Sequence, residues 1–189
     1  MRLRSSRALA IALAATFALQ ACSDGETETG ETAEVSKETL ATMVAETGDL
    51  STVSGALGDA GLAQVFDGAA SYTLLAPQDA AFDALGETGQ ELRSPEQRAA
   101  MVAILREHVV PGYLTPDDIA AAIEAAGDGS VEMRTMGEQV LTFTSEGDAI
   151  TVTAEDGASA HFTGDALRAS NGVVIPLDGL LKRVAPPAT

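Results

Sequence analysis

Two histidines, His108 and His161, and a single cysteine, Cys22, are the side chains of this chain best suited to catalysis or metal binding. A histidine can act as a general base or bind a metal, and a thiolate can act as a nucleophile. The histidines lie far apart in sequence and no second cysteine accompanies them, so no zinc-ligand spacing is present. No serine stands in a Gly-x-Ser-x-Gly elbow, and there is no glycine-rich phosphate loop. We expect no enzyme and no cofactor, although a serine, histidine and aspartate brought together by folding stays open as a third hypothesis.

His108 completes an apolar helical face that also contains Met101, Ile104 and Leu105. A histidine in such a position is typical of a core residue whose ring nitrogen satisfies a nearby backbone carbonyl. We favour this structural role over a catalytic one. His161 alternates into a predicted strand and is interpreted in the same way.

Acidic side chains offer two possible cation sites. Asp79 and Asp83 are four residues apart on one predicted helix and could share a cation, but helix capping and solvation explain them more simply. Asp24, Glu26 and Glu28 have the spacing that opens a calcium loop, yet the sixth loop position lacks glycine and the twelfth lacks glutamate. The sequence therefore predicts no metal site.

The N-terminus reads as an export signal. Residues 1–21 combine three arginines with an apolar run over 8–19 that is too short to span a bilayer as a permanent helix. Residues 19–22, Leu-Gln-Ala-Cys, resemble the lipobox of bacterial lipoproteins. The resemblance implies cleavage after residue 21 and lipidation of Cys22, and an ordinary secretory signal with an incidental thiol is the alternative. Ser23, by resemblance to Gram-negative sorting, favours the outer membrane over the inner one.

The charge of the chain limits its partners. The formal net charge is −17 at pH 7, which argues against binding nucleic acid and against direct docking on anionic lipid. Residues 22–36 are acidic and poor in apolar side chains, so we expect a disordered tether there. Residues 37–184 are enough for one self-sufficient domain, and residues 185–189 are expected to form a loose tail.

Hydrophobic spacing predicts helices over 40–46, over 50–66 with breaks at Gly58 and Gly61, from Ser94 to about 108, and from Thr115 to about 126. Ser94 and Thr115 each precede a proline in the first helical position, as capped helices often do. Residues 86–91 read as a loop. From residue 131 the period changes to two, which predicts an antiparallel meander of about four strands ending at 161–162.

The segment 72–85 predicts a buried strand, a break at Pro77 and a helix that opens near Asp79 as its N-cap. It resembles the first signature of the fasciclin (FAS1) domain. The matching positions include Thr73, Ala76, Pro77, Asp79 and Phe82. Leu75 replaces the usual phenylalanine and Gln78 the common threonine.

Two further segments carry the same resemblance. Residues 106–114 are similar to the middle fasciclin element through His108, Pro111 and Gly112, with Glu107 in the place of the family's tyrosine. Residues 164–181 resemble the second signature, and their matching positions include Asn171, Gly172 and Asp178. The Asn171-Gly172 pair predicts a positive-φ turn before a buried strand, and Pro176 predicts an edge strand or a bulge.

This resemblance spans residues 37–184 and implies an α/β (α+β) fold, a β-wedge with an antiparallel meander packed against several helices. The motif positions are then mainly structural. The implied function is a lipid-anchored cell-envelope module for adhesion or matrix contact, with protein or glycan partners and possible self-association. Because the tyrosine is missing, the family's Tyr-His contact is not carried over. The alternative is a carrier of a small apolar ligand, a lipid or pigment, in the periplasm or at the outer membrane. Four methionines could adapt around such a guest in a cleft between helices and wedge, namely Met43, Met101, Met133 and Met136.

Overall fold

A computed structural model describes residues 35–147 and 149–184, which all belong to one unit spanning 33–189. The predicted signal, Cys22, nearly all of the tether and the tail over 185–189 lie outside the described residues. None of the helices in the described part is long and apolar enough to cross a membrane.

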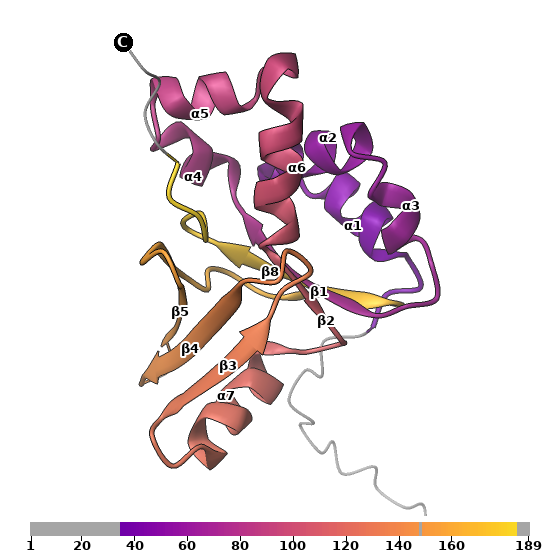
Figure 1. Cartoon of the computed structure of the whole chain (residues 1–189). Coiled ribbons are helices and arrows are strands. Elements are labelled where there is room, and N and C mark those ends of the chain that lie inside the picture. The colour runs from indigo at the N-terminus through magenta and orange to yellow at the C-terminus, as the bar shows by residue number, and fades with distance from the viewer. Residues whose placement is uncertain (1–34, 148, 185–189) are drawn as a thin grey trace, which may run out of the picture. The chain divides into compact units, whose positions relative to one another are not determined.

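Eight strands form two four-stranded sheets in the described residues (Figure 1). The central sheet has the order β2-β1-β8-β7, and the meander sheet has the order β3-β4-β5-β6. The central strands are β1 (Tyr72–Pro77), β2 (Val109–Pro111), β7 (Leu167–Ala169) and β8 (Gly172–Leu177). The meander strands are β3 (Ser130–Arg134), β4 (Val140–Glu146), β5 (Ala149–Ala154) and β6 (Ser159–His161). The predicted mixed fold and its four-stranded antiparallel meander are confirmed.

The first and second signatures lie side by side because β1 and β8 are paired in parallel. Their register runs without interruption from Tyr72 opposite Gly172 to Pro77 opposite Leu177. β2, from the middle element, flanks β1 on the other side in antiparallel orientation. Three segments that are distant in sequence thus become neighbours in one sheet.

Alternate side chains of the central sheet enter two different cores. Leu74, Ala76 and Val174 pack with the helices that precede β2, whereas Leu75 and Ile175 pack with the meander sheet and α7. Burial on both faces explains why β1 and β8 read as continuous apolar runs rather than as alternating ones.

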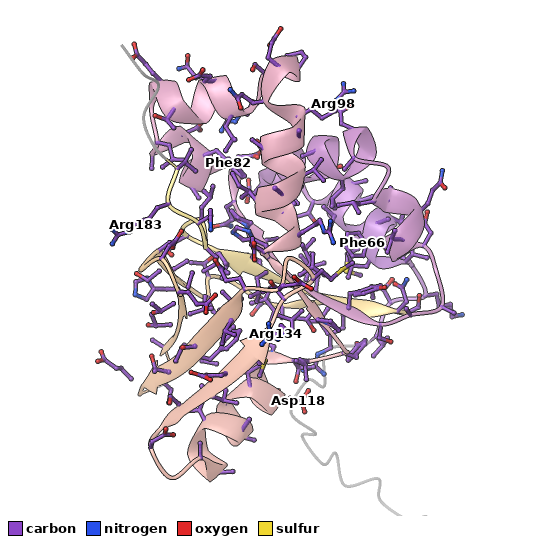
Figure 2. The ribbon with its side chains drawn as sticks, in the orientation of Figure 1. Phe66, Phe82, Arg98, Asp118, Arg134 and Arg183 are labelled. Atoms are coloured by element: carbon purple, nitrogen blue, oxygen red, sulfur yellow. The ribbon has the colours of Figure 1, made fainter. Side chains whose placement is uncertain are left out.

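The helices fall into two groups along the chain (Figure 1). Those before β2 are α1 (Leu40–Glu46), α2 (Ser51–Asp59), α3 (Ala63–Phe66), α4 (Asp79–Asp83), α5 (Glu87–Leu92) and α6 (Arg98–Arg106), with 3-10 turns η1 (Gly48–Leu50) and η2 (Pro95–Gln97). After β2 comes α7 (Pro116–Ala125). Phe66 and Phe82, labelled in Figure 2, are fully buried among the first group. Thr115 and Asp118 form the capping box of α7, at the start that the sequence predicts.

On the path to α6, one local prediction is wrong and a second holds only in part. Residues 87–92 form helix α5 instead of a loop. Gly86 has a φ of +59°, and a Cβ at Gly89 would overlap the Phe82 carbonyl oxygen, so glycines here permit a tight helical turn rather than a loop. Ser94 is at the N-cap position with Pro95 directly after it, as predicted. It makes no side-chain capping bond, however, and the helical segment opens with the short η2 turn before α6 begins at Arg98.

Pro176 lies in an interior strand, without a bulge, so the predicted edge or bulge is wrong. The backbone N–H groups of Tyr72 and Gln78 donate to the carbonyls of Asn171 and Leu177, so the odd-numbered residues of this strand bond to β1. Because successive residues of a strand face opposite sides, the backbone groups of Pro176 point away from β1. On that side β7 pairs with β8 only over residues 172–174. The missing N–H of the proline therefore falls beyond the end of β7 and interrupts no ladder.

Candidate functional site: a signature junction and an arginine-flanked cleft

Thr73 joins the first signature to the middle element. Its hydroxyl donates to the Gly112 carbonyl at 2.9 Å and accepts the Leu114 N–H at 2.9 Å. Gly112 has a φ of +112°, a conformation that suits glycine, and this turn aims both backbone groups at Thr73. Pro111 precedes the turn and lies opposite Tyr72 in the register. The motif residues Thr73 and Gly112 are therefore bonded to each other, and Pro111 lies beside them in the sheet.

His108 is completely buried and both of its ring nitrogens are occupied. Nδ1 lies 2.8 Å from the Ile104 carbonyl, and Nε2 accepts the Leu181 N–H at 2.9 Å. Because a backbone N–H can only donate, Nδ1 must carry the ring proton. Burial lowers the pKa of His108 to about 4, and the bond to the Ile104 carbonyl opposes this shift only in part. The imidazole is thus neutral at pH 7, and neither nitrogen is free to act as a base.

The backbone of His108 adds a third contact, since its carbonyl accepts the Leu75 N–H at 2.9 Å. One residue thus connects the end of α6, strand β1 and the chain after β8. We use the name signature junction for Thr73, His108 and Asn171 together with the groups that they bind.

Asn171 anchors the first helices to the second signature. Its Oδ1 accepts the Leu40 N–H at 2.8 Å, and its Nδ2 donates to the carbonyls of Phe66 and Gly68. A Cβ at Gly172 would overlap the Tyr72 carbonyl oxygen and the Leu40 side chain, so close packing requires glycine here. The predicted positive-φ turn is wrong, because neither Asn171 nor Gly172 has a positive φ.

Asp178 and His161 join the two sheets at the surface. The backbone N–H of His161 donates to Asp178 Oδ1 at 2.7 Å, its ring Nδ1 lies 2.9 Å from Oδ2, and the Asp178 N–H donates back to the His161 carbonyl. Partial burial would raise the pKa of Asp178, but the bonds from His161 outweigh that effect and lower it. Both side chains are about half exposed, and no hydroxyl bonds to this imidazole within the described residues.

Asp79 caps a different helix from the one predicted. Gln78 occupies the N-cap position of α4, while the Asp79 carboxylate accepts the Ser51 N–H and hydroxyl and the Thr52 N–H at the start of α2. Partial burial would raise the pKa of Asp79, but the hydrogen bonds from Thr52 and Ser51 lower it overall. The sequence identified a capping aspartate correctly but assigned it to the wrong helix, because the partner is distant in sequence.

The possible shared cation between Asp79 and Asp83 has no support in this geometry. Asp83 turns to Arg93, which donates to it at 2.7 Å, and the oxygens of Asp79 face α2. Over the described ranges, no group of three or more His, Cys, Asp or Glu side chains lies close enough to hold a metal ion.

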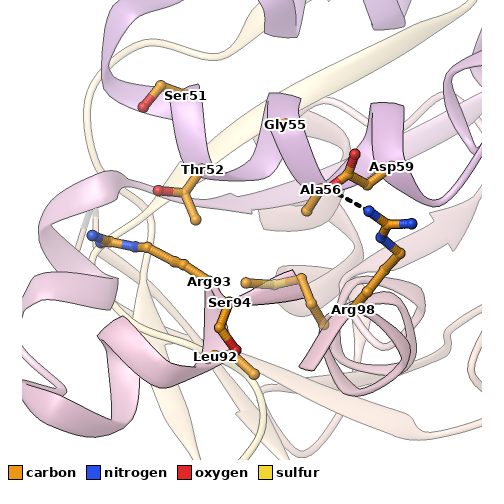
Figure 3. Close-up of a pocket in the computed structure, with 10 residues that line it drawn as sticks. Ser51, Thr52, Gly55, Ala56, Asp59, Leu92, Arg93, Ser94 and Arg98 are labelled. Carbon is orange, nitrogen blue, oxygen red and sulfur yellow. Dashed lines mark ion pairs between the residues drawn. The ribbon is translucent and has the colours of Figure 1, made fainter. Parts of the chain in front are cut away.

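A cleft of about 220 Å3 lies between α2 and the segment that runs from α5 into α6 (Figure 3). We call it the α2–α6 cleft. It is lined by Ser51, Thr52, Gly55, Ala56 and Asp59 on one side and by Leu92, Arg93, Ser94, Arg98 and Met101 on the other. Of the methionines considered for an apolar guest, Met101 lines this cleft, whereas Met43 and Met136 line two other hollows. The methionines therefore do not gather around one cavity.

Two arginines flank the cleft and are held very differently. Arg93 donates to Asp83 at 2.7 Å and to the Asp79 carbonyl at 3.2 Å, and its guanidinium lies 5.6 Å above the Phe82 ring. Arg98 lies 3.8 Å from Asp59, at the outer limit of an ion pair, with both side chains more than half exposed. In Figures 2 and 3, Arg98 extends from the start of α6 toward α2.

The family follows from a comparison of the whole chain with known proteins. The model of the fasciclin domain matches residues 48–183, well over half of the sequence. The chain belongs to the fasciclin family. It is 29% identical over 144 residues to Protein sll1483 of Synechocystis sp., and the alignment covers 76% of this chain and 72% of that protein.

The fasciclin fold is also found in a solved structure of a FAS1 domain pair from the insect cell adhesion molecule Fasciclin I. The TM-score is 0.66 at 14% sequence identity. The match covers 77% of this chain and 51% of the solved one, so this chain spans about half the length of the domain pair. At this identity the likeness supports the fold alone.

Glu107 replaces the family's tyrosine, and the structure turns it inward. Its Oε2 accepts the Thr135 hydroxyl at 3.0 Å, and its carboxylate lies against Gly137, where a Cβ would overlap it. In this fasciclin domain, therefore, the position before His108 contacts the β3–β4 turn of the same chain.

Sequence reasoning missed the α2–α6 cleft. Its walls come from two helices that show only ordinary amphipathic spacing, and neither Arg93 nor Arg98 belongs to a motif that the sequence singles out. A weak signal was available in Gly55, a glycine inside a helix without a packing reason. A Cβ at Gly55 would meet no atom within 4 Å, so there is open space beside this glycine. That space can be recognised from the structure but not from the sequence.

Proposed function

We propose that this fasciclin domain is a non-enzymatic contact module, held at the cell envelope by lipid on Cys22 and binding protein or glycan surfaces. The observation that carries the proposal is the fasciclin match over residues 48–183 in a chain that opens with a lipobox-like signal. The solved structure with this fold comes from a protein named as a cell adhesion molecule, and adhesion is the role that we propose here.

The surface supports polar rather than apolar contacts. Among the described residues, the large hydrophobic side chains that are exposed are only Val35 and Val65. Stable obligate interfaces are more apolar than this, whereas reversible contacts use polar and charged groups. Self-association, if it occurs, would therefore depend on salt.

The state of the two histidines supports a module without catalytic activity. The ring nitrogens of His108 are both bonded to backbone groups, and His161 is bonded to Asp178 at an open surface. General-base catalysis needs an imidazole that can reach a substrate or a nucleophile.

The proposed anchoring and location rest on the sequence of the first residues. Lipid on Cys22 and a polar tether over 22–36 would present the domain at a distance from the membrane. Ser23 favours the outer membrane, in either the periplasmic or the outward orientation.

The experiment compares three strains of the host bacterium: wild type, a Cys22→Ala variant and a clean deletion. We expect Cys22→Ala to move the protein from the membrane to the soluble fraction and to reduce cell attachment to the level of the deletion. Gln20→Ala is the matched control, because it changes the lipobox-like segment but keeps the thiol. Release of the protein without any loss of cell attachment would contradict the adhesion role but would still support the lipid anchor on Cys22.

A carrier of a small apolar ligand stays the second candidate, on the observation that the domain contains a defined cleft. Native mass spectrometry of protein purified from its host would detect a retained lipid or pigment. If no small molecule is retained and a lipid and pigment screen gives no binding, this candidate is wrong.

A further inference from the structure

The α2–α6 cleft combines an apolar floor with a charged rim. Leu92 and Met101 are almost fully buried, with 4% and 5% of their surface exposed, and they line the cleft together with Ala56. At the rim stand the hydroxyl residues Thr52 and Ser94 and the two arginines. Small-molecule sites commonly have an apolar floor with a few polar groups around it, and these polar groups orient the ligand.

The two guanidinium groups differ in what they can offer a ligand. Arg93 is fixed by a short bond to Asp83 and by its position over Phe82, and its role is to shape one end of the cleft. Among the described residues, Arg98 has one carboxylate neighbour, Asp59 at 3.8 Å, which is too long for a hydrogen bond. A carboxylate within 3 Å of Arg98 would therefore bind it more strongly than Asp59 does.

The negative charge of the chain limits the places where an anion can bind. With a formal net charge of −17, the chain as a whole repels anions. An anion therefore needs a local cation and a desolvating wall, and the α2–α6 cleft offers both. A ligand with several negative charges would meet Asp59 as well, so a single carboxylate fits best.

The volume limits the apolar part of the ligand. The cleft measures about 220 Å3, somewhat more than the ~150 Å3 apolar cavity that holds benzene. A ring or chain of roughly six to eight carbons is the size that such a volume accommodates.

We propose that the α2–α6 cleft binds a compact organic monocarboxylate, with its apolar body on Ala56, Leu92 and Met101 and its carboxylate on Arg98. The site depends neither on the lipid anchor nor on the adhesion role, so it can be tested separately from the proposed function.

Methionine methyl groups provide the probe. In the chain labelled with 13C at its methionine methyls, sodium octanoate is added and the methyl spectrum is followed. We expect saturable shifts at Met101 and none at Met43, Met133 or Met136, which lie elsewhere. Shifts spread evenly over these four methyls, or none at Met101, would overturn the proposal.

The role of Arg98 is tested by a double comparison of variant and ligand. Arg98→Gln should weaken octanoate binding by roughly tenfold to hundredfold, which is the contribution of a charged hydrogen bond. Octanamide, which is neutral, should bind the wild type and Arg98→Gln with the same affinity. Equal affinity of both proteins for octanoate would show that the carboxylate does not use Arg98 and would overturn the assignment.

Two glycines of α2 provide a matched steric test. Gly55 lines the cleft and Gly58 does not, and a Cβ at either position meets no atom within 4 Å. Gly55→Leu should fill the cleft and abolish the Met101 response, whereas Gly58→Leu should leave it unchanged. Both substitutions replace glycine within a helix, so neither is expected to prevent folding. An unchanged response in Gly55→Leu would place octanoate outside the cleft and contradict the proposal.

Discussion

The signature junction and the α2–α6 cleft differ in how their polar side chains are bonded. In the junction, Thr73, His108 and Asn171 are bonded to backbone groups of distant segments. In the cleft, Arg98 makes a long contact of 3.8 Å with the exposed carboxylate of Asp59, its one ion pair within the part of the chain that the structure describes. The residues by which the family is recognised thus build the fold, and the groups that remain available to a ligand or partner lie outside the signatures.

The largest effect is expected from breaking the junction. His108→Ala leaves the Leu181 N–H without its acceptor in the core and also creates a cavity, whereas the Ile104 carbonyl keeps its bond from the Glu107 N–H. We expect a loss of about 3–5 kcal/mol in the free energy of unfolding, measured with urea. His161→Ala is the control and should cost less than about 1 kcal/mol, because its pair with Asp178 is half exposed. Similar losses in the two variants would mean that the junction is not a special contributor to stability.

Acid should weaken the same contact. The pKa of His108 is about 4 in the folded chain and 6.5 ordinarily, so the unfolded chain takes up the proton first as the pH falls. Stability is then complete above about pH 6.5 and is lost toward pH 4, by roughly 2–3 kcal/mol at pH 4.5. Four aspartates also have lowered pKa values, and the stability that they contribute is lost only as the pH falls below their ordinary pKa of 3.8. They are Asp79, Asp118, Asp156 and Asp178. His108→Gln keeps an acceptor but cannot titrate, and its unfolding free energy should fall less between pH 7 and 4.5. An equal fall would assign the acid sensitivity to other groups.

A smaller effect is expected at the helix that forms one wall of the cleft. Asp79→Ala removes the cap of α2 and should cost about 1–2 kcal/mol. Asp83→Ala breaks only an exposed ion pair and should cost no more than about 0.5 kcal/mol. Thermal unfolding of the two variants measured side by side would show the difference. If Asp83→Ala were the more damaging, the surface pair rather than the cap would stabilise this region.

The smallest effect on stability is expected in the cleft itself. Arg98→Gln removes a 3.8 Å ion pair between exposed side chains and should change the free energy of unfolding by less than about 0.5 kcal/mol. This near-neutral result is what distinguishes a ligand-binding arginine from a structural one. A loss comparable to that of His108→Ala would place Arg98 among the residues that hold the fold together.

The same contrast explains what could be predicted from the sequence. The signatures and the alternating strands gave the fold, because hydrophobic period and turn chemistry are local properties. Pro176, Asp79 and the α5 segment were misjudged because their outcome depends on partners distant in the chain, namely the end of β7, the start of α2 and the Phe82 carbonyl. The cleft had no sequence signal beyond Gly55, since an unfilled space belongs to no single residue.

The signature histidine, His108, is a neutral structural group rather than a reactive one. The chain contains only His108 and His161, so a 15N NMR spectrum of the imidazoles can be assigned with a single variant, His161→Gln. We predict that His108 shows the tautomer protonated at Nδ1 and stays neutral from about pH 8 to about pH 5. An Nε2-protonated tautomer, or protonation with a midpoint near 6.5, would contradict the account.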